Sequence, residues 1–452
     1  MRTLLNAALC LWFGTVATNA VVGQTRPNVI VILADDLGYE CLTANGGTSY
    51  QTPNLDRLAA SGVRYTNAHV QPLCTPTRVQ VMTGQYNVRN YVAFGQLRPG
   101  ELTFGNLLRD AGYCTAIAGK WQLGRELELP KKFGFDEHVL WQHIRFAPRF
   151  ANPGLEHQGE PRDYTNGEYG PDLISQFALD FLTRQAAMQD GNGGKPFLLY
   201  YPMILPHFPH QATPDSDDWD PTLRGERKAR DPRHFKDMVR YMDKLVGKLI
   251  DKLDSLRLRD NTMVLFVGDN GTNVNIRSKL DGKTIRGAKR FTIVHGTHVP
   301  MIVNWRNTIA AGVCDDLVDS TDILPTVCDA AGVTLPATMT VDGYSLIPQL
   351  LGKPHRPRDW VYCWYSPRGE PLQVFALDHQ HKLYRTGALF DYRQDPLEKR
   401  PLPYEALPTV RRKLQVALAK YESARPATLP WPGNKPPAAS SATKSTPVKK
   451  KQ

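Results

Sequence analysis

The sequence predicts an α/β fold in which helices flank a large, mostly parallel β-sheet. The first observation is a set of short apolar runs rich in β-branched residues, which suit strands buried on both faces. The second observation is that segments with apolar residues three and four positions apart stand between these runs. Strands that alternate with helices are typical of parallel sheets, because each strand needs a crossover connection to the next.

Within the main domain, the pattern of apolar residues places five strands and three helices in chain order. The strands are residues 28–33, 115–118, 197–202, 262–267 and 299–305. The helices are residues 52–62, 231–256 and 316–332. In the first helix, Thr52 is a candidate N-cap, Pro53 suits the first turn and Gly62 is a stop signal. Pro325 is expected to break the third helix.

Loops and a second, smaller unit complete the expected organisation. Segments 144–170 and 205–232 are rich in Pro, Gly, Asp and Arg, so they are expected to be long surface loops that carry substrate recognition. Residues 24–350 are expected to form the main domain. Residues 351–425 are expected to form a C-terminal subdomain with a short antiparallel sheet and a helix near 405–423.

Both ends of the chain have compositions that differ from the folded part. Residues 1–23 contain one basic residue, a short apolar run and small residues, which indicates a secretory signal peptide and no membrane span. The protein is therefore expected to be exported, to a periplasm or the extracellular space. Residues 426–452 contain five lysines and no acid, and are expected to be a disordered basic tail.

The net charge gives only a weak indication of the partner. The formal charge is +11, and removing the tail lysines and Arg2 leaves +5 for the folded body. That excess is compatible with an anionic substrate, and no nucleic-acid partner is expected. After Cys10 leaves with the signal peptide, six scattered cysteines remain, without the spacing of a zinc site or a disulfide scaffold. Cys74 stands alone before a predicted helix, which raises the question of what an isolated thiol does there.

Acidic and amide residues follow two of the predicted strands. Asp35 and Asp36 come directly after residues 28–33, and Asp269 and Asn270 follow 262–267 closely. Sites in open α/β sheets form at the carboxyl ends of strands, and hard oxygen ligands without His or Cys suit Ca²⁺ or Mg²⁺. The alternative is that both clusters are turn-forming residues, which Asp, Asn and Gly often are.

The stretch around the isolated thiol resembles a family signature. Cys74-Thr75-Pro76-Thr77-Arg78 is similar to the Cys-x-Pro-x-Arg motif of the type I sulfatases of the alkaline phosphatase superfamily, with Thr77 in place of the usual serine. The resemblance runs from about Asn28 to Pro401. Further similar segments are PNVIVILADDLGY at 27–39, GKWQLG at 119–124, PHFP at 206–209, GDNGT at 268–272 and RGAKRFTIVHGTHVP at 286–300.

The resemblance implies an alkaline-phosphatase-like sandwich and a nucleophile made from Cys74. In that family a formylglycine-generating enzyme, or another sulfatase-maturating enzyme, oxidises the cysteine to an aldehyde, which is hydrated in the resting enzyme. The hydrate would attack sulfur and then collapse to expel sulfate. The implied ligands of a calcium ion, with magnesium as an alternative, are Asp35, Asp36, Asp269, Asn270 and the modified Cys74.

The resemblance also implies roles for several cationic residues. Arg78 would contact the modified residue and offset the carboxylates, while Lys120 and Lys289 would bind sulfate oxygens. His207 would contact sulfate and protonate the departing oxygen, because the pKa of histidine lies near neutral pH. His298 stands where the family has arginine, and is expected to contact the substrate.

Gln122 is the main departure from the family pattern. The family has histidine there, which contacts the hydrate and is a candidate base for its collapse. An amide can orient that hydroxyl group but cannot accept its proton at neutral pH. The hypothesis is an active enzyme whose turnover is limited by regeneration of the aldehyde.

Three functions remain open at this point. The first is hydrolysis of a sulfate ester, of a small molecule or a glycan, with a carbohydrate as the expected substrate. The second is a catalytically silent protein that binds sulfated glycans, which the glutamine at position 122 suggests. The third is a formylglycine-dependent phosphodiester or phosphonate hydrolase, because the same scaffold serves that chemistry.

Overall fold

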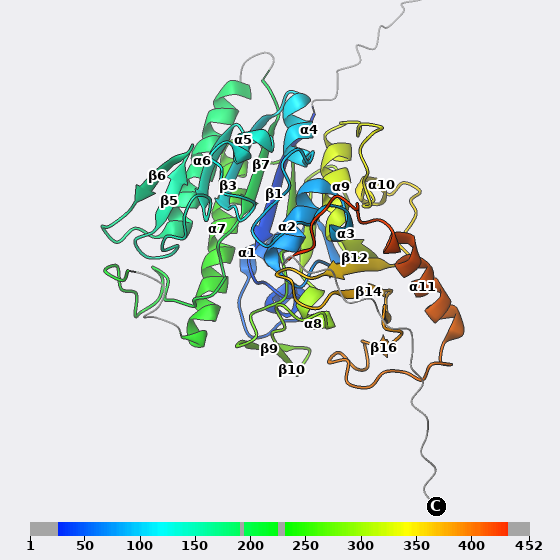
Figure 1. Cartoon of the computed structure of the whole chain (residues 1–452). Coiled ribbons are helices and arrows are strands. Elements are labelled where there is room, and N and C mark those ends of the chain that lie inside the picture. Colours follow the sequence, from blue (N-terminus) through cyan, green and yellow to red (C-terminus); the bar gives the residue numbers. More distant parts are fainter. Residues whose placement is uncertain (1–25, 190–193, 225–230, 433–452) are drawn as a thin grey trace, which may run out of the picture.

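The protein is built on one ten-stranded sheet. The computed structural model describes residues 26–189, 194–224 and 231–432. The strand order is β12-β2-β11-β8-β1-β7-β3-β4-β5-β6, and Figure 1 shows the sheet running through the body of the molecule. The strands are β1 Asn28–Ala34, β2 Val63–His69, β3 Cys114–Lys120, β4 Glu137–Trp141, β5 Gly154–His157, β6 Glu160–Asp163, β7 Phe197–Pro202, β8 Thr262–Gly268, β11 Met301–Asn304 and β12 Gly312–Asp319.

The sheet is mixed, and its centre is parallel. Strands β8, β1, β7, β3 and β4 all run in one direction. Strand β11 is antiparallel to both of its neighbours, and β5 and β6 form an antiparallel edge. The expected mostly parallel arrangement is therefore confirmed for the centre of the sheet, and the antiparallel pairs are those of the internal strand β11 and of the β4–β5–β6 edge.

Helices cover both faces of the sheet. Their bounds are α1 Pro53–Ala60, α2 Cys74–Thr83, α3 Asn87–Asn90, α4 Phe104–Asp110, α5 Leu129–Lys132, α6 Gly170–Gln189, α7 Phe235–Ser255, α8 Val294–Thr297, α9 Ile323–Ala330, α10 Ile347–Leu350 and α11 Pro408–Glu422. Helices α2, α4 and α9 pack on one face, and α1, α6 and α7 on the other (Figure 1). Strand β1 is buried on both sides: Val29 and Val31 face the first layer, and Ile30 and Ile32 face the second.

Several elements differ from the expectation. Helix α9 begins only at Ile323, because residues 316–319 continue strand β12 beside β2. Pro325 lies in the first turn of α9, where its missing N–H breaks no hydrogen bond, so it does not interrupt the helix. Thr52 precedes α1 but makes no capping bond, since its hydroxyl donates to Asp56 Oδ1 at 3.2 Å. The expected loop at 144–170 contains the β5–β6 hairpin.

A separate four-stranded antiparallel sheet follows the main sheet. It comprises β13 Val361–Tyr365, β14 Gln373–Leu377, β15 His381–Tyr384 and β16 Leu389–Asp391, and α11 packs against it. The other face of this small sheet packs on Leu73 and Cys74. A two-stranded ribbon, β9 Arg277–Leu280 and β10 Lys283–Arg286, completes the strands of the described residues.

The packed chain continues beyond the expected boundary at 425. The Trp431 ring stacks on Trp364 with centroids 5.9 Å apart, and Leu429 is buried. The remainder of the expected tail, 433–452, and the expected signal peptide, 1–23, lie outside the described residues. Across the described ranges, no helix combines the length and apolar character that a bilayer crossing requires. All six cysteines within those ranges are free thiols.

Candidate active site

The ends of neighbouring parallel strands bring the acidic residues together. Ala34, the last residue of β1, pairs with Gly268, the last residue of β8, so the residues that follow each strand are adjacent. The Asp36 backbone N–H donates to Asp269 Oδ1 at 3.0 Å, and Asn270 Nδ2 donates to Asp36 Oδ1 at 2.9 Å. These side chains and Asp35 are completely buried. The four expected oxygen ligands therefore form one cluster.

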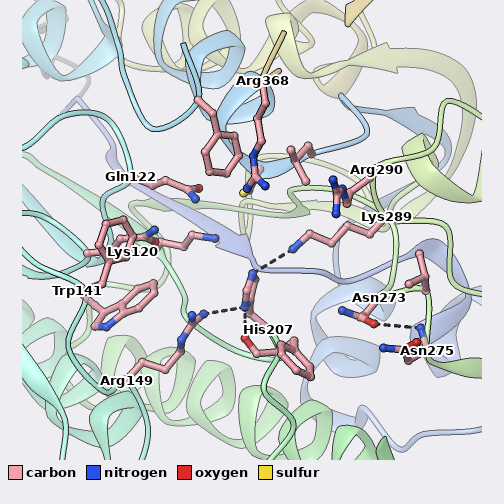
Figure 2. Close-up of a pocket in the computed structure, with 17 residues that line it drawn as sticks. Lys120, Gln122, Trp141, Arg149, His207, Asn273, Asn275, Lys289, Arg290 and Arg368 are labelled. Atoms are coloured by element: carbon pink, nitrogen blue, oxygen red, sulfur yellow. Dashed lines mark hydrogen bonds between the residues drawn. The ribbon is translucent and has the colours of Figure 1, made fainter. Parts of the chain in front are cut away.

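Two lysines reach this cluster from other elements. Lys120 is the last residue of β3, and its Nζ donates to both carboxylate oxygens of Asp35, at 2.9 and 2.8 Å. Lys289 follows β10 and lies 2.5 Å from Asp36 Oδ1. Its Nζ also lies 3.0 Å from Nε2 of His207, which follows β7 (Figure 2).

The close approach of β3 to β7 requires glycine before Lys120. Gly119 has φ +132°, a conformation that L side chains rarely adopt, and a Cβ there would lie 2.0 Å from the Pro202 carbonyl oxygen. This steric requirement explains the glycine of the GKWQLG segment, because it lets β3 place Lys120 beside β1.

Cys74 is the first residue of α2, whose ten residues are all buried. Its position at a helix N-terminus favours negative charge on or near the side chain. The Thr77 hydroxyl accepts from the Gln71 backbone N–H at 3.1 Å and so holds the segment that leads into Cys74. Either Ser or Thr can supply this hydroxyl, which explains why the threonine is compatible with the site.

Arg78 connects Cys74 to the acidic cluster. It lies one helical turn after Cys74, and its Nη2 donates to Asp269 Oδ2 at 3.0 Å. Its Nη1 donates to the Lys120 carbonyl oxygen at 3.1 Å. The guanidinium group is fully buried, so it is held between β8 and β3. It contacts a carboxylate and a carbonyl oxygen of the site directly.

A pocket of about 520 Å³ opens in front of these residues (Figure 2). Cys74, Lys120, Gln122, His207 and Lys289 all line it. Sequence reasoning did not identify a further set of lining residues, which are mainly aromatic or cationic: Phe94, Trp141, Phe146, Arg149, Phe208, Arg290 and Arg368. The expected recognition role of segments 144–170 and 205–232 could have pointed to Phe146, Arg149 and Phe208.

Comparison with known proteins decides the family. A model of the sulfatase family matches residues 27–333, which is more than half of the chain. The chain belongs to the sulfatase family. The family described as N-sulphoglucosamine sulphohydrolase, C-terminal, matches residues 287–423. The protein is thus a sulfuric ester hydrolase of the alkaline phosphatase superfamily. Members of the sulfatase family generally use a formylglycine and a divalent cation.

Individual relatives agree with this assignment. Arylsulfatase A of Bos taurus is 33% identical over 406 residues, covering 81% of this chain and 76% of that protein. N-acetylgalactosamine-6-sulfatase of Canis lupus familiaris is 32% identical over 403 residues, covering 82% and 74%. The crystal structure of Ps i-CgsB in complex with k-i-k-neocarrahexaose has a TM-score of 0.73 and 26% identity, covering 89% of this chain and 94% of that one.

The acidic cluster of this sulfatase fits a divalent cation. Asp36 Oδ2 and Asn270 Oδ1 are buried acceptor atoms without a hydrogen-bond partner among the described residues. Burial and the neighbouring Asp35 raise the pKa of Asp269 to about 7, despite Arg78. A cation would supply the missing partner for both oxygens and relieve the repulsion between the carboxylates. Asp35, Asp36, Asp269 and Asn270 offer oxygens, the ligands that Ca²⁺ and Mg²⁺ prefer. A ring nitrogen of His207 also lies within 4.8 Å of the ligand atoms of Asp35 and Asp36.

His207 does not titrate near neutral pH as expected. Burial and the positive charge of Lys289 lower its pKa well below 6.5, although Asp35 opposes the shift. The ring is therefore neutral in this state. Arg149 Nη1 lies 2.7 Å from Nδ1, so a second cationic group faces the other ring nitrogen (Figure 2). Two cis peptide bonds, Leu205–Pro206 and Phe208–Pro209, bracket the residue.

Gln122 occupies a restricted position at the pocket. Its backbone has φ +55°, in the left-handed region that few residues other than glycine adopt. Its side chain is nearly buried, and Oε1 lacks a hydrogen-bond partner among the described residues. Asp36 also lies in the left-handed region, at φ +67°. Backbone outliers of this kind cluster at functional sites. Gln122 lines the pocket, and Asp36 belongs to the acidic cluster behind it.

His298 is not part of this pocket, contrary to the expectation. Its ring stacks on Tyr39 with centroids 4.1 Å apart, and Nε2 donates to the Thr66 carbonyl oxygen at 2.8 Å. It lines a different pocket, beside His69. The one-turn helix α8 directs the chain from Lys289 toward β11, and this turn places His298 beside His69 at the end of β2.

A second buried group of possible ligand residues lies beside β4 and β5. His138 Nε2 lies 3.2 Å from Glu156 Oε1, and His143 Nδ1 contacts the other carboxylate oxygen. His143 Nε2 donates to the Glu126 carbonyl oxygen at 2.8 Å. These contacts connect β4, β5 and the loop after β3, so the group holds together the wall of the pocket that carries Trp141.

Replacement of Glu156 by glutamine should change the acid stability of this sulfatase. Burial raises the pKa of Glu156, but hydrogen bonds from His138 and His143 outweigh it and lower the value to about 2. A carboxyl group whose pKa is lower in the folded protein than in the unfolded chain stabilises the fold at pH values above its ordinary pKa. This stabilisation is lost as the pH falls toward 2. Glu156→Gln should therefore remove on the order of 3 kcal/mol at pH 6 and much less at pH 2.5. Urea unfolding of both proteins between pH 2.5 and 6 tests this prediction. A difference in the free energy of unfolding that stays constant with pH contradicts it.

Proposed function

We propose that this sulfatase hydrolyses a sulfate ester of a carbohydrate, using a formylglycine made from Cys74 and a bound calcium ion. The observation that carries the proposal is that Cys74, Lys120, His207 and Lys289 line one pocket directly in front of the acidic cluster. In this arrangement a nucleophile, sulfate-binding cations and a cation site lie within reach of a single sulfate group.

The residues of the chain then have distinct tasks. Lys120 and Lys289 bind and orient the sulfate oxygens, and Arg78 holds Asp269 in place next to Cys74. When bound, the cation makes a hydroxyl of the hydrated aldehyde easier to ionise and balances charge on the sulfate. The ligands that we assign to it are Asp35, Asp36, Asp269, Asn270 and the modified Cys74. Oxygen donors suit both Ca²⁺ and Mg²⁺. We choose calcium, with magnesium as the alternative, because of the family resemblance.

The proton for the departing oxygen depends on a pair of residues. His207 is neutral, and its Nε2 faces Lys289 Nζ at 3.0 Å. A neutral imidazole that accepts a proton at this nitrogen cannot also donate from it. We therefore assign the proton to the Lys289 ammonium group, which His207 Nε2 orients by accepting its hydrogen bond and which donates directly to the departing ester oxygen.

Carbohydrate is the substrate class that the relatives favour. One relative is named as an N-acetylgalactosamine-6-sulfatase, and a structural neighbour was crystallised with k-i-k-neocarrahexaose. The pocket adds aromatic side chains, among them Trp141 and Phe94, next to the cationic groups. Aromatic faces suit the apolar faces of sugar rings, while the cations suit sulfate.

Sulfate release from a panel of substrates tests this function. The mature enzyme, produced together with a formylglycine-generating enzyme, is expected to release sulfate from at least one sulfated disaccharide and from 4-nitrophenyl sulfate. Preference for an aryl phosphodiester over the aryl sulfate would favour the phosphodiester or phosphonate hydrolase. Binding of sulfated disaccharides without any turnover by fully modified protein would favour the silent binder.

Replacing Gln122 by histidine should raise the turnover of the fully modified enzyme. Histidine tolerates positive φ better than most residues, and Gln122 makes no hydrogen bond through Oε1 to the described residues. An imidazole there could accept the proton that is lost when the aldehyde is regenerated. General bases contribute about 10²- to 10⁴-fold, so an increase in kcat of at least about 10-fold is expected. Unchanged kcat with equal modification of both proteins contradicts the idea.

Export and maturation belong to the same proposal. We propose that residues 1–23 are a signal peptide and that the enzyme acts in a periplasm or outside the cell. The catalytic domain is assigned to 24–350, the subdomain to 351–425 and a basic tail to 426–452, with its first residues packed on β13. A sulfatase-maturating enzyme is the protein partner that this route requires.

A further inference from the structure

The pocket holds more positive charge than its carboxylates balance. Lys120 and Lys289 are paired with Asp35 and Asp36, which lie behind the pocket surface. Arg290 and Arg368 also line the pocket, but neither forms an ion pair with a described residue. Asp and Glu are absent from the described residues that line the pocket. Glu370 accepts from the Arg368 backbone N–H at 2.7 Å but forms no ion pair with its guanidinium group, so both arginines still present positive charge to whatever occupies the pocket.

Their positions place both side chains at the mouth of the pocket. Arg290 follows Lys289 directly, and its backbone N–H donates to the Pro72 carbonyl oxygen at 2.7 Å, two residues before Cys74. Arg368 lies on the turn between β13 and β14, and its guanidinium carbon lies 4.0 Å from the centre of the Phe94 ring. Figure 2 shows Arg290 and Arg368 pointing into the pocket from the side opposite Arg149 and His207. Both residues are exposed.

The sulfate being hydrolysed does not require these two charges. The cluster contains the carboxylates of Asp35, Asp36 and Asp269, and the cations of Arg78, Lys120 and Lys289 match them one for one. The divalent cation of the proposed function then supplies the charge that a sulfate ester and an ionised nucleophile need. A further pair of arginines at the entrance is in excess of what one sulfate group can use.

We propose that Arg290 and Arg368 form a second anion subsite, which binds a sulfate or carboxylate group on the sugar unit next to the sulfate ester that is cleaved. The inference deepens the proposed function and rests on it: the substrate is a glycan with at least two anionic groups. A pocket of about 520 Å³ lies within the range of about 300–1,000 Å³ typical of small-molecule sites, so it can hold more than the sulfate group. Guanidinium groups suit sulfate and carboxylate because they donate two parallel hydrogen bonds.

Substrate discrimination tests the subsite. kcat/KM is measured for a monosulfated disaccharide, its disulfated counterpart, and one that carries a sulfate and a carboxylate. The wild type is expected to prefer the doubly charged substrates by about 10- to 100-fold, the value of one or two charge-assisted hydrogen bonds. Arg368→Gln, Arg290→Gln and the double variant should lower this preference stepwise. Arg412→Gln, an exposed arginine of α11 away from the pocket, should leave it unchanged.

A binding measurement separates the subsite from catalysis. Calorimetry with the inactive Cys74→Ala variant compares the affinity for the disulfated and monosulfated disaccharides, with and without Arg368→Gln. A loss of the affinity difference supports the subsite, and the sulfate–carboxylate disaccharide shows which anion it binds better. An equal affinity for both disaccharides, or a difference that survives the double variant, overturns the subsite even when the enzyme releases sulfate. Absence of sulfate release from every substrate contradicts the proposed function alone.

Discussion

Cys74→Ala abolishes sulfate release while the protein stays folded. Alanine cannot be converted to an aldehyde, so the pocket loses its nucleophile. Hydrolases that lose their nucleophile retain only the rate that binding and charge stabilisation provide, and kcat falls by about 10⁴- to 10⁶-fold. The change is small in volume, and Cys74 makes no hydrogen bond through its thiol to the described residues, so a stability cost of about 1 kcal/mol is expected.

Cys114→Ala provides the matched control for this experiment. Cys114 is another free thiol, at the beginning of β3 and outside the pocket. Its replacement should leave kcat within about 2-fold of the wild type. Substitutions away from the active site and the closely packed core change the free energy of unfolding by about 0.5 kcal/mol. Sulfate release by the Cys74→Ala variant at a rate near that of the control would exclude Cys74 as the source of the nucleophile.

Asp36→Asn weakens cation binding by at least about 100-fold and abolishes activity at low calcium. Asp36 contributes a carboxylate whose Oδ2 has no partner among the described residues, and its other oxygen contacts Lys289. Changes to outer-shell residues alone cost about 10- to 100-fold in metal affinity, so loss of a charged ligand should cost more. Calorimetric titration of chelator-treated protein with calcium measures the affinity directly.

The thermal stability of the same variant provides an independent readout. Chelator should lower the melting temperature of the wild type, because a ligand that binds only the folded state stabilises it. The melting temperature of Asp36→Asn should respond little to chelator. Asp251→Asn, which changes an exposed carboxylate on α7 paired with Arg57, is the matched control and should behave as the wild type. An unchanged calcium affinity in Asp36→Asn would remove Asp36 from the ligand set.

The sequence predicted the acidic cluster well because its causes are local. Asp35 and Asp269 directly follow apolar strands, and adjacent parallel strands end at the same edge of the sheet. Lys120 also ends a parallel strand, β3, but only the family resemblance singled it out in the sequence. The roles of these residues rest on the family resemblance, and the structure adds their contacts: Lys120 with Asp35, and Arg78 with Asp269.

The positions of the other pocket residues depend on contacts between distant parts of the chain. The spacing of apolar residues in the sequence does not predict such contacts. Arg368 reaches the pocket only because the small C-terminal sheet packs on Leu73 and Cys74. His298 stands where the family has arginine and was expected to contact the substrate, yet the turn of α8 places it against Tyr39. Residues 316–319 have a helix-like pattern of apolar residues, but pairing with β2 makes them a strand, since an edge of the sheet was available.

The most direct test of the account is the chemical identity of residue 74 in active enzyme. Mass spectrometry of the peptide that contains Cys74, from protein produced with a formylglycine-generating enzyme, should detect an aldehyde in place of the thiol. The fraction of aldehyde should rise in proportion to the rate of sulfate release across preparations. Full sulfatase activity in a preparation whose residue 74 is entirely an unmodified thiol would contradict the account.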